Sequence, residues 1–499
     1  MNAATSKKIE PDQSWPTAML IDGVPTPGDG EAIAVENPAT ASVFLSFAGA
    51  SPAQFDRAIA VARETADRGE WAAMSASRRA AIVQRYIDLL LEQADDLERI
   101  VIAEAGCPIS SAVMPVQVRL PLIQARQQLD LYLTLPESES NPLPLDDRIN
   151  FAGNVFQSMR RYVPHGVVAA ISAYNFPFFL NAWKVMPALA TGNCVILRPS
   201  PLTPLSALAM ADAAQRAGIP AGVFQILAEA GAEGALRLTT DPAVDMVSFT
   251  GSTDVGRKVM AQAAPTMKRL QLELGGKSAQ IFLPDRLEAS ASAAASVCLS
   301  HAGQGCVLGT RVFVPETDKE RLMAMMAASL ESVVIGDPLD PGTQMGPVIT
   351  RGQVERCERY VALAMQAGAR IVTGGKRVGR PGHYFEPTIL DVPDNSNPAA
   401  QDEIFGPIVS VIGYRDVDHA VEMANDTIFG LSGYVWSADT RAALNVAKRI
   451  RSGTVNVNMG GALSAYGSSG GLGLSGLGRE RGVEGLRVYQ DLQVLNFTH

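Results

Sequence analysis

The sequence lacks any block of like charges. Its 42 Lys and Arg and 51 Asp and Glu, for a net charge of −9, are spread along all 499 residues. The basic patch that marks a nucleic-acid-binding protein is therefore absent. A long uninterrupted apolar run is also lacking, because the most apolar stretch, residues 167–197, is broken by Asn175, Pro177, Lys184 and Pro187. A membrane span tolerates such residues poorly. No apolar stretch follows the two lysines near the start, so we expect a cytoplasmic protein without a signal peptide that binds neither nucleic acid nor membrane.

Paired cysteines and clustered histidines are lacking too. The chain has five cysteines and five histidines, all widely spaced, and no Cys-x-x-Cys pair. The odd number of cysteines predicts reduced thiols rather than a disulfide framework. The scattered histidines offer no metal-ligand spacing, so we expect no metal site.

The sequence does have helical and strand-like patterns that alternate. The predicted helices cover 54–66, 77–104, 205–217 and 233–238, and the predicted strands cover 154–164, 166–172, 195–197, 223–227 and 246–249. A second α/β series runs from about 279 to 454. This order predicts two α/β layers with parallel sheets that are joined near 272–276.

Two segments stand apart from this alternation. A polar, Pro-rich connector covers 136–148, and the C-terminal segment 487–497 alternates between apolar and polar residues. Such a late strand must pair with a sheet edge, either in its own domain or on another subunit.

Cys306 ends the segment Gly303-Gln304-Gly305-Cys306. Small neighbours leave a thiol open to approach, which suits a nucleophile, although an isolated cysteine is more often a buried structural one. His301, five residues earlier, raises the alternative of a cysteine hydrolase. Catalytic Cys–His pairs, however, usually come from distant parts of a chain.

Glu273 lies at the end of an apolar run, ahead of Gly275-Gly276-Lys277. A carboxylate there is costly unless it is paired or used. Desolvation would raise its pKa toward the value that a general base needs. The alternative is a salt bridge to Lys277 or another basic residue.

Two further segments follow predicted strands. In the run Phe249–Gly256, a glycine follows the strand, and Ser252 or Thr253 can cap a helix whose free N–H groups suit a pyrophosphate. Asn175, ahead of Phe176 and Pro177, either donates its amide to an oxyanion or is a turn asparagine. The first run is not a Gly-x-Gly-x-x-Gly fingerprint, so neither segment is specific by itself.

In their joint order and spacing, these segments resemble the aldehyde dehydrogenase superfamily over nearly the whole chain. The further matching segments are Arg198-Pro199-Ser200, Gly336-Asp337-Pro338, Met345-Gly346-Pro347, Glu403 to Pro407, Asn425-Asp426-Thr427 and Ser475 to Glu480. The resemblance implies an α/β fold with two Rossmann-like domains and a small β oligomerisation arm. It implies a dinucleotide-binding domain at 1–136 and 165–272, a catalytic domain at 273–480, and an arm at 137–164 and 481–499 that builds a homodimer or homotetramer.

The resemblance also implies the chemistry. Cys306 attacks the aldehyde, and the oxyanion of the thiohemiacetal is held by the Asn175 amide and the Cys306 N–H. After hydride transfer to the nicotinamide, Glu273 activates the water that hydrolyses the thioester to the acid. Lys184 and Glu480 match positions that act near Glu273 as a proton relay.

The implied cofactor is NAD, with NADP possible. Glu403 matches the carboxylate that holds the nicotinamide ribose, and Phe405 matches the ring beside the nicotinamide. All the positions that the resemblance assigns to the dinucleotide are Ser172, Ala173, Tyr174, Arg198, Ser200, Gly231, Phe249, Thr250, Gly251, Ser252, Leu274, Gly275, Glu403 and Phe405.

Two segments depart from the family pattern. Where the family usually has Lys-Pro-x-Glu at the adenine ribose, this chain has Arg198-Pro199-Ser200-Pro201. Without the glutamate a 2′-phosphate is not repelled, and Arg198 could pair with it, so we expect a loose choice between NAD and NADP. A Pro-Phe-Gly-Gly-like segment near the substrate entrance is replaced by Ser468-Ser469-Gly470-Gly471.

The substrate pocket implied by the resemblance has mainly apolar walls. Its residues are Phe176, Leu180, Trp183, Ser300, Val307 and Tyr466, with Phe179 as a neighbour. These walls predict a hydrophobic or aromatic aldehyde, unless the aromatic side chains serve only to pack the core.

Three other functions compete with this one. Relatives that pass the acyl group to coenzyme A generally lack the glutamate at the Glu273 position, and non-catalytic members often lose the cysteine. A cysteine hydrolase would leave the cofactor residues without a purpose.

Overall fold

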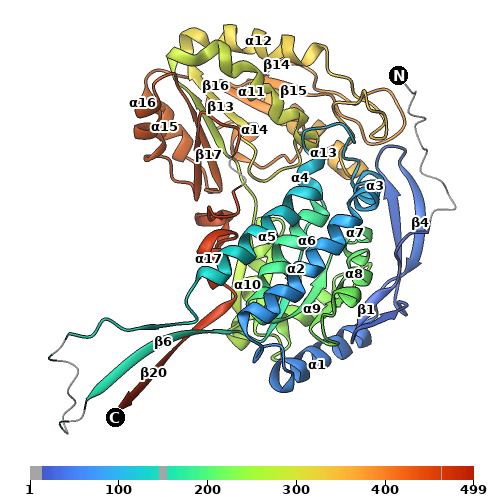
Figure 1. Cartoon of the computed structure of the whole chain (residues 1–499). Helices are drawn as coiled ribbons and strands as arrows, with labels where there is room; N and C mark the ends of the chain where they lie inside the picture. Colours follow the sequence, from blue (N-terminus) through green and yellow to red (C-terminus); the bar gives the residue numbers. More distant parts are fainter. Residues whose placement is uncertain (1–13, 145, 147–152, 154, 462–463, 499) are drawn as a thin grey trace.

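The computed structural model describes residues 14–144, 146, 153, 155–461 and 464–498. Figure 1 shows an upper and a lower α/β unit, with a long β projection that leaves the lower unit. Each unit is built on its own largely parallel sheet. The predicted α/β class, with two layered units and a β arm, is confirmed.

The lower unit contains an eight-stranded sheet. In spatial order its strands are β19 (Gly476–Leu477), β11 (Arg269–Glu273), β10 (Met246–Thr250), β7 (Val167–Ile171), β8 (Cys194–Arg198), β9 (Phe224–Ile226), β1 (Met19–Ile21) and β2 (Val24–Thr26). Strands β7 to β11 are parallel, whereas β1, β2 and β19 are antiparallel to their neighbours. Every residue of β7, β8, β9 and β10 is buried, because helices cover both faces of the sheet.

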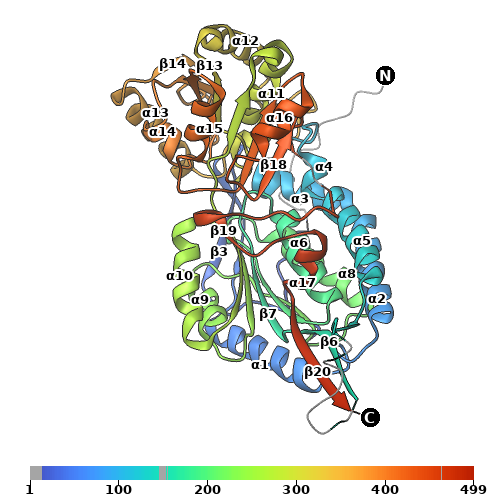
Figure 2. The ribbon, with the colours of Figure 1, turned by 90° about the vertical axis from the view of Figure 1, so that its left-hand side faces the viewer.

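Helices cover the two faces of this sheet as Figure 2 shows. One face carries α1 (Pro52–Arg68), α9 (Glu233–Thr240) and α10 (Thr253–Ala263), and the other carries α2 (Ala76–Glu92), α3 (Ala94–Ala105), α4 (Met114–Gln117), α5 (Arg119–Thr134), α6 (Pro177–Ala190), α7 (Leu205–Leu208) and α8 (Met210–Ala217). A separate hairpin, β3 (Ala32–Asn37) and β4 (Ser42–Ala48), runs along the edge of the unit.

The single helices predicted over 77–104 and 205–217 are wrong in one respect, since each is two helices. Gln93, with φ −95° and ψ 7°, interrupts the first. Asp95 and Asp96 in the first turn then favour a new helix start, because their charges offset the helix dipole. Ala209 separates α7 from α8, although its own φ of −62° and ψ of −18° remain helical.

The upper unit contains a seven-stranded sheet. In spatial order its strands are β14 (Arg370–Thr373), β15 (Thr388–Asp391), β16 (Ile408–Tyr414), β13 (Arg311–Pro315), β12 (Ala279–Phe282), β17 (Ser432–Trp436) and β18 (Thr454–Val457), of which only β14 is antiparallel to its neighbour. One face carries α11 (Leu287–Leu299) and α12 (Lys319–Glu331), and the other carries α13 (Arg351–Gln366), α14 (Pro398–Gln401), α15 (Val417–Asn425) and α16 (Thr440–Ala447). Each face has its own apolar core.

The projection in Figure 1 is a three-stranded sheet. Strand β20 (Gln490–Thr498) pairs antiparallel with β6 (Phe156–Pro164) along its full length, and β5 (Ser138–Ser140) pairs with the other edge of β6. The C-terminal strand therefore pairs within its own chain. Residues 145, 147–152, 154 and 499 of the expected arm, and residues 1–13, lie outside the described residues.

The C-terminal segment is not all strand. Helix α17 (Gly482–Arg487) precedes β20 and packs on α5 and α6 of the lower unit. The projection thus begins only at Gln490, where β20 starts.

The carboxyl ends of β7 to β11 meet at one edge of the lower sheet. Strand β11 continues through residues 274–278 directly into β12, so this edge faces the upper unit. Ligands of parallel sheets bind at such an edge, where the order of the strands reverses. Within the described part of the chain, no helix combines the length and the apolarity that crossing a membrane requires.

Candidate active site

Cys306 follows a strained turn at the end of α11. His301 and Ala302 have φ values of 48° and 51°, and Gly303 has a φ of 73°. A Cβ at Gly303 would lie 2.0 Å from the carbonyl oxygen of Gly406, so only glycine fits there. Cys306 is half-buried, whereas the other four cysteines are buried. Cys306 is therefore the one cysteine of the five whose side chain is partly accessible to solvent.

The surroundings of Cys306 favour the neutral thiol. Burial raises its pKa to about 12, and the nearby carboxylates of Glu403, Glu273 and Glu480 raise it further. These interactions also show that the three carboxylates lie within electrostatic reach of the sulfur. A cation beside the sulfur would have the opposite effect and favour the thiolate.

Asn175 is held against the turn that carries Cys306. Its Nδ2 donates to the carbonyl oxygen of Gln304 at 2.8 Å, and its own backbone carbonyl accepts from Gln117 Nε2 at 3.1 Å. The side chain is buried, just ahead of Pro177, the first residue of α6. The Asn175 amide thus lies at the turn that carries Cys306, and its role as an oxyanion donor stays a prediction. Gln117 was missed, because nothing in the sequence links it to Asn175.

Glu273 is a buried carboxylate at the end of β11. Its Oε1 has no hydrogen-bond partner among the described residues. Burial raises its pKa well above the usual value, the neighbouring Glu480 raises it further, and Lys184 opposes the shift. The alternative salt bridge from Glu273 to Lys277 is wrong for the described part of the chain, since Lys277 interacts instead with Glu403 and Asp402.

Lys184 and Glu480 form a buried ion pair. Lys184 Nζ donates to Glu480 Oε1 and to Ser248 Oγ, both at 3.1 Å. Behind the ammonium, Ser248 Oγ donates to Gln271 Oε1 at 2.6 Å, and Tyr489 OH donates to the same oxygen at 3.1 Å. The Lys184 ammonium beside Glu273 is therefore held in place by a continuous network of hydrogen bonds.

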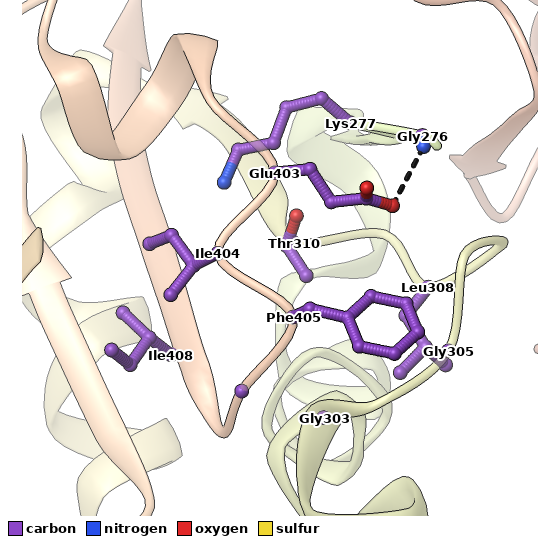
Figure 3. A pocket seen from close by; sticks show the side chains of 11 residues that line it. Gly276, Lys277, Gly303, Gly305, Leu308, Thr310, Glu403, Ile404, Phe405 and Ile408 are labelled. Atoms are coloured by element: carbon purple, nitrogen blue, oxygen red, sulfur yellow. Dashed lines mark hydrogen bonds between the residues drawn. The ribbon is translucent and has the colours of Figure 1, made fainter. Parts of the chain in front are cut away.

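Figure 3 shows Glu403 and Phe405 lining a small pocket, which Gly303 and Gly305 of the nucleophile turn also line. Glu403 Oε1 accepts from the backbone N–H of Gly276 at 2.8 Å. The ring of Phe405 lies beside Gly305, and its backbone has a φ of 63°. Burial raises the pKa of the Glu403 carboxyl.

Two side chains of α13 hold this segment. Arg356 Nη2 donates to the carbonyl of Glu403 at 2.5 Å and its Nε donates to that of Ile404 at 3.1 Å. Gln353 Nε2 donates to the carbonyls of Ile404 and Phe405, each at 2.8 Å. These bonds offset the cost of the left-handed backbone at Phe405. Neither residue was singled out in the sequence.

The positions expected to bind a dinucleotide in the lower unit share the edge that faces the upper unit. Grouped by strand, they are Ser172, Ala173 and Tyr174 after β7, Arg198 and Ser200 at β8, Gly231 after β9, Phe249, Thr250, Gly251 and Ser252 at β10, and Leu274 and Gly275 after β11. Ser252 caps α10 by accepting from the N–H of Val255. The remaining free N–H groups at the start of α10 suit a phosphate.

This edge fits a dinucleotide on two further observations. The hydroxyl of Thr250 is buried and has no partner among the described residues. A Cβ built on Gly231 would meet nothing within 4 Å, so the end of β9 is open. The donors and the open space together match the phosphates and the sugars of such a ligand.

Arg198 is already paired. Its Nε donates to Glu229 Oε1 at 2.9 Å, and its Nη2 donates to the carbonyl of Gly231 at 2.6 Å. Both side chains of the ion pair are nearly buried. The arginine that the sequence offers to a 2′-phosphate is thus bound to Glu229 and Gly231, and its contact with the dinucleotide stays a prediction. Glu229 was not singled out in the sequence.

Only some of the residues expected to line the substrate pocket lie together. Phe179, Leu180 and Trp183 on α6 form a small apolar cluster that also contacts Phe176. The guanidinium of Arg481 lies 4.8 Å from the centre of the Trp183 ring, which adds a charge that the sequence did not predict. Val307 and Tyr466 are exposed, and Ser300 is partly buried.

His301 does not pair with Cys306. Neither ring nitrogen has a hydrogen-bond partner among the described residues, and the ring lies 5.5 Å from that of Phe176. Burial lowers its pKa to about 4. The described residues therefore contain no Cys–His dyad at this site, and they also hold no cluster of His, Cys, Asp and Glu that could bind a metal.

Comparison with known proteins agrees with this geometry. The sequence model described as "Aldehyde dehydrogenase family" matches residues 26–495. The chain is 35% identical over 483 residues to the glutarate-semialdehyde dehydrogenase of Pseudomonas aeruginosa, covering 95% of this chain and 96% of the relative.

Two solved structures from Pseudomonas syringae are similar. Aldehyde dehydrogenase C, a cysteine variant in complex with NAD+ and octanal, has a TM-score of 0.90 and 34% identity, with 96% of both chains covered. Indole-3-acetaldehyde dehydrogenase AldA, a cysteine variant in complex with NAD+ and IAA, has a TM-score of 0.92 and 33% identity, with 98% of both chains covered.

Proposed function

Because the chain belongs to the aldehyde dehydrogenase family, whose members are oxidoreductases that act on aldehydes, we propose that it oxidises a hydrophobic or aromatic aldehyde to its carboxylic acid with NAD. The observation that carries this proposal is the joint position of three groups. Cys306 is the half-buried thiol, the Asn175 amide is bound to its turn, and Glu273 is a buried carboxylate within electrostatic reach of the sulfur.

Cys306 acts as the nucleophile. Its sulfur adds to the aldehyde carbon and gives a thiohemiacetal, whose oxyanion accepts from Asn175 Nδ2 and from the Cys306 N–H. Donors of this kind each contribute roughly 3 kcal/mol to a transition state in known enzymes. Asn175 is suited to this role because its bond to Gln304 fixes the amide and leaves its second N–H available.

Glu273 acts as the base of the second half-reaction. Once a thioester has formed on Cys306, the carboxylate takes a proton from the water that attacks it, and the acid is released. Burial and Glu480 raise the pKa of Glu273 and so increase its basicity. Lys184 and Glu480 lie next to it as the groups through which the proton can leave.

NAD supplies the hydride acceptor that converts the thiohemiacetal into the thioester, and NADP is the alternative cofactor. Ser252 and the start of α10 would hold its pyrophosphate. Glu403 would hold the ribose on the reactive side, and Phe405 would pack beside the reactive ring. The segment 403–405 is suited to this because four side-chain bonds from α13 fix its backbone.

The aromatic cluster on α6 supports an apolar or aromatic substrate. Phe176, Phe179 and Trp183 offer wide apolar faces that recognise rings or alkyl chains. The related aldehyde dehydrogenase C was solved in complex with octanal, and the related AldA is an indole-3-acetaldehyde dehydrogenase, so both names point to compounds of this class. The guanidinium of Arg481 donates to the Ser464 carbonyl and to the Ser469 hydroxyl while it lies over the Trp183 ring, so the aromatic cluster borders one positive charge.

The projecting strands support a homodimer or homotetramer. The apolar side chains on β20 that remain exposed are Leu492, Val494, Leu495 and Phe497. A projecting sheet with such residues on its faces is stabilised by a second copy of the chain.

The experiment is an absorbance assay for reduced nicotinamide with a panel of apolar, aromatic and acidic aldehydes and with both cofactors. We expect reduction that needs no coenzyme A, is fastest with apolar or aromatic aldehydes, and is lost in Cys306→Ser. Dependence on coenzyme A would indicate an acyl-transferring relative, and ester hydrolysis without reduction would indicate a hydrolase. Preference for a short polar or acidic aldehyde would reject the proposed substrate class alone.

A further inference from the structure

We propose that Glu229 makes this enzyme prefer NAD over NADP, by occupying the two positive groups that could otherwise bind a 2′-phosphate. This inference rests on the proposed function, in which a dinucleotide lies across the edge formed by β7 to β11. It concerns a residue that takes no part in the chemistry at Cys306.

The strand order defines where each half of the dinucleotide lies. The order reverses at β7, with β10 and β11 on one side and β8 and β9 on the other. A dinucleotide bound at such a point spreads one nucleoside over each half of the sheet. The carbonyl of Cys306 lies against Gly276, just beyond β11, so the reactive ring belongs over β10 and β11. The adenosine therefore belongs over the ends of β8 and β9.

Arg198 would be the natural partner of a 2′-phosphate at that place. It ends β8, and an arginine near the ribose accommodates the extra phosphate of NADP in parallel-sheet enzymes. Its guanidinium is however bound by Glu229 Oε1 at 2.9 Å and by the carbonyl of Gly231 at 2.6 Å. The net charge of the Arg198–Glu229 pair is zero.

The start of α9 is the second positive group at this end of the sheet. Two of its backbone N–H groups, those of Gly234 and Ala235, donate to the carboxylate of Glu229 at 2.7 and 2.9 Å. The carboxylate thus offsets the positive end of the helix dipole. One side chain thus binds both the arginine and the helix terminus.

A 2′-phosphate at this place would therefore meet the Glu229 carboxylate beside positive groups that this carboxylate already binds. The ribose hydroxyl of NAD carries no charge and does not incur this repulsion. Glu229 is 4% exposed, so the repulsion is only weakly screened by water. Glu229 thus determines cofactor specificity, both through its bond to Arg198 and through the electrostatic field of its carboxylate.

The test measures equilibrium binding of NAD and NADP to the full-length protein by calorimetry. We expect the wild type to bind NAD at least about tenfold more tightly than NADP. Glu229→Gln keeps the shape and an acceptor but removes the charge, so the Kd of NADP should fall at least about fivefold while that of NAD changes less than about twofold. The double variant Arg198→Met with Glu229→Gln should lose this gain.

Glu233→Gln is the matched control. Glu233 is an exposed carboxylate in the first turn of α9 that has no bond to Arg198. Its removal should change the ratio of the two Kd values by less than about twofold, because water screens it.

Three results would overturn the inference. Equal affinity of the wild type for NAD and NADP is the first, and it needs no variant to fold. Equal weakening of both cofactors in Glu229→Gln would assign it a purely structural role. Retention of the NADP gain without Arg198 would remove the arginine from the explanation. If neither dinucleotide bound, the proposed function itself would fail.

Discussion

The Lys184 ammonium lies 3.1 Å from the Glu480 carboxylate at a place where neither group is open to water. The lysine side chain is 0% exposed and the glutamate side chain 7%. An ion pair in such a place persists only because each charge has the other, together with Ser248. The pair therefore places a fixed positive charge within reach of Glu273.

Removal of one partner should destabilise the fold. Lys184→Met leaves the Glu480 charge buried and unpaired, so the free energy of unfolding in urea should fall by ~3–5 kcal/mol. Lys184→Met with Glu480→Gln should recover part of that loss. The same change at the exposed Lys258 of α10 should cost less than about 0.5 kcal/mol.

The thiol of Cys306 should react faster as the pH rises. It is the one cysteine that is not buried, and its pKa is raised to about 12. The thiolate fraction, and with it the rate of alkylation by iodoacetamide, should rise about tenfold per pH unit between pH ~7 and ~10 without a plateau. Peptide mass spectrometry locates the label and gives its rate.

Glu403→Gln serves as the companion variant in that experiment. Glu403 is the carboxylate that raises the pKa of Cys306 most, so its neutralisation should speed the labelling at each pH. A plateau near pH ~8 in the wild-type protein would contradict the raised pKa.

Glu273→Gln should separate the two half-reactions. The amide cannot take a proton from water, so turnover with an aldehyde and NAD should fall by about 10²–10⁴-fold. Oxidation on Cys306 does not need this base in the proposed mechanism, so a single burst of reduced cofactor should remain in stopped-flow traces. Loss of the burst together with turnover would place Glu273 in the first step instead.

His301 should make the protein lose stability in acid. Its pKa is about 4 in the folded protein, below the ordinary value near 6.5. Because the unfolded chain takes up the proton first, the stability that this residue contributes is complete above pH ~6.5 and is lost as the pH falls to ~4. Relative to His301→Asn, the wild type should lose ~3 kcal/mol over that window.

Urea unfolding at several pH values measures this loss, and asparagine tolerates the left-handed backbone at position 301. His419→Asn, a change at a partly exposed histidine on α15, is the control. Parallel pH profiles for the wild type and His301→Asn would show that the pKa of His301 is the same in the folded and the unfolded protein.

The apolar face of β20 should hold the oligomer together. Leu492→Asp with Val494→Asp puts charges on exposed apolar positions of the projection, so light scattering at micromolar concentration should show monomers. Asn496→Asp on the same strand adds a charge without removing an apolar contact and should leave the assembly intact. A wild-type protein that is already monomeric would reject the proposed assembly.

The sequence predicts the framework better than the pairing of side chains. Strand β7 is apolar at every position, which is typical of a strand that is covered on both faces in an α/β fold. The interruption at Gln93 could not be predicted, because neither glycine nor proline marks it. The approach of Asn175 to Gln304 and of Arg356 to Glu403 depends on how distant segments cross.

Glu229 illustrates the same limit. The arginine that it binds lies 31 residues away along the chain, and any of the many acidic residues could have been its partner on sequence grounds. The sequence could identify Arg198 as a departure from the family pattern. The meaning of that departure depended on a neighbour from a different strand.

The close contact between Gly303 and Gly406 couples the movements of two segments that lie far apart in the sequence. Both surfaces there are main chain, with room for no more than a hydrogen atom, so no rotamer change could absorb an added methyl group. A shift of the sulfur-bearing turn must therefore displace the Glu403–Phe405 segment by a similar amount. In the proposed mechanism, a change in the position of the thiol would therefore also change the position of the nicotinamide.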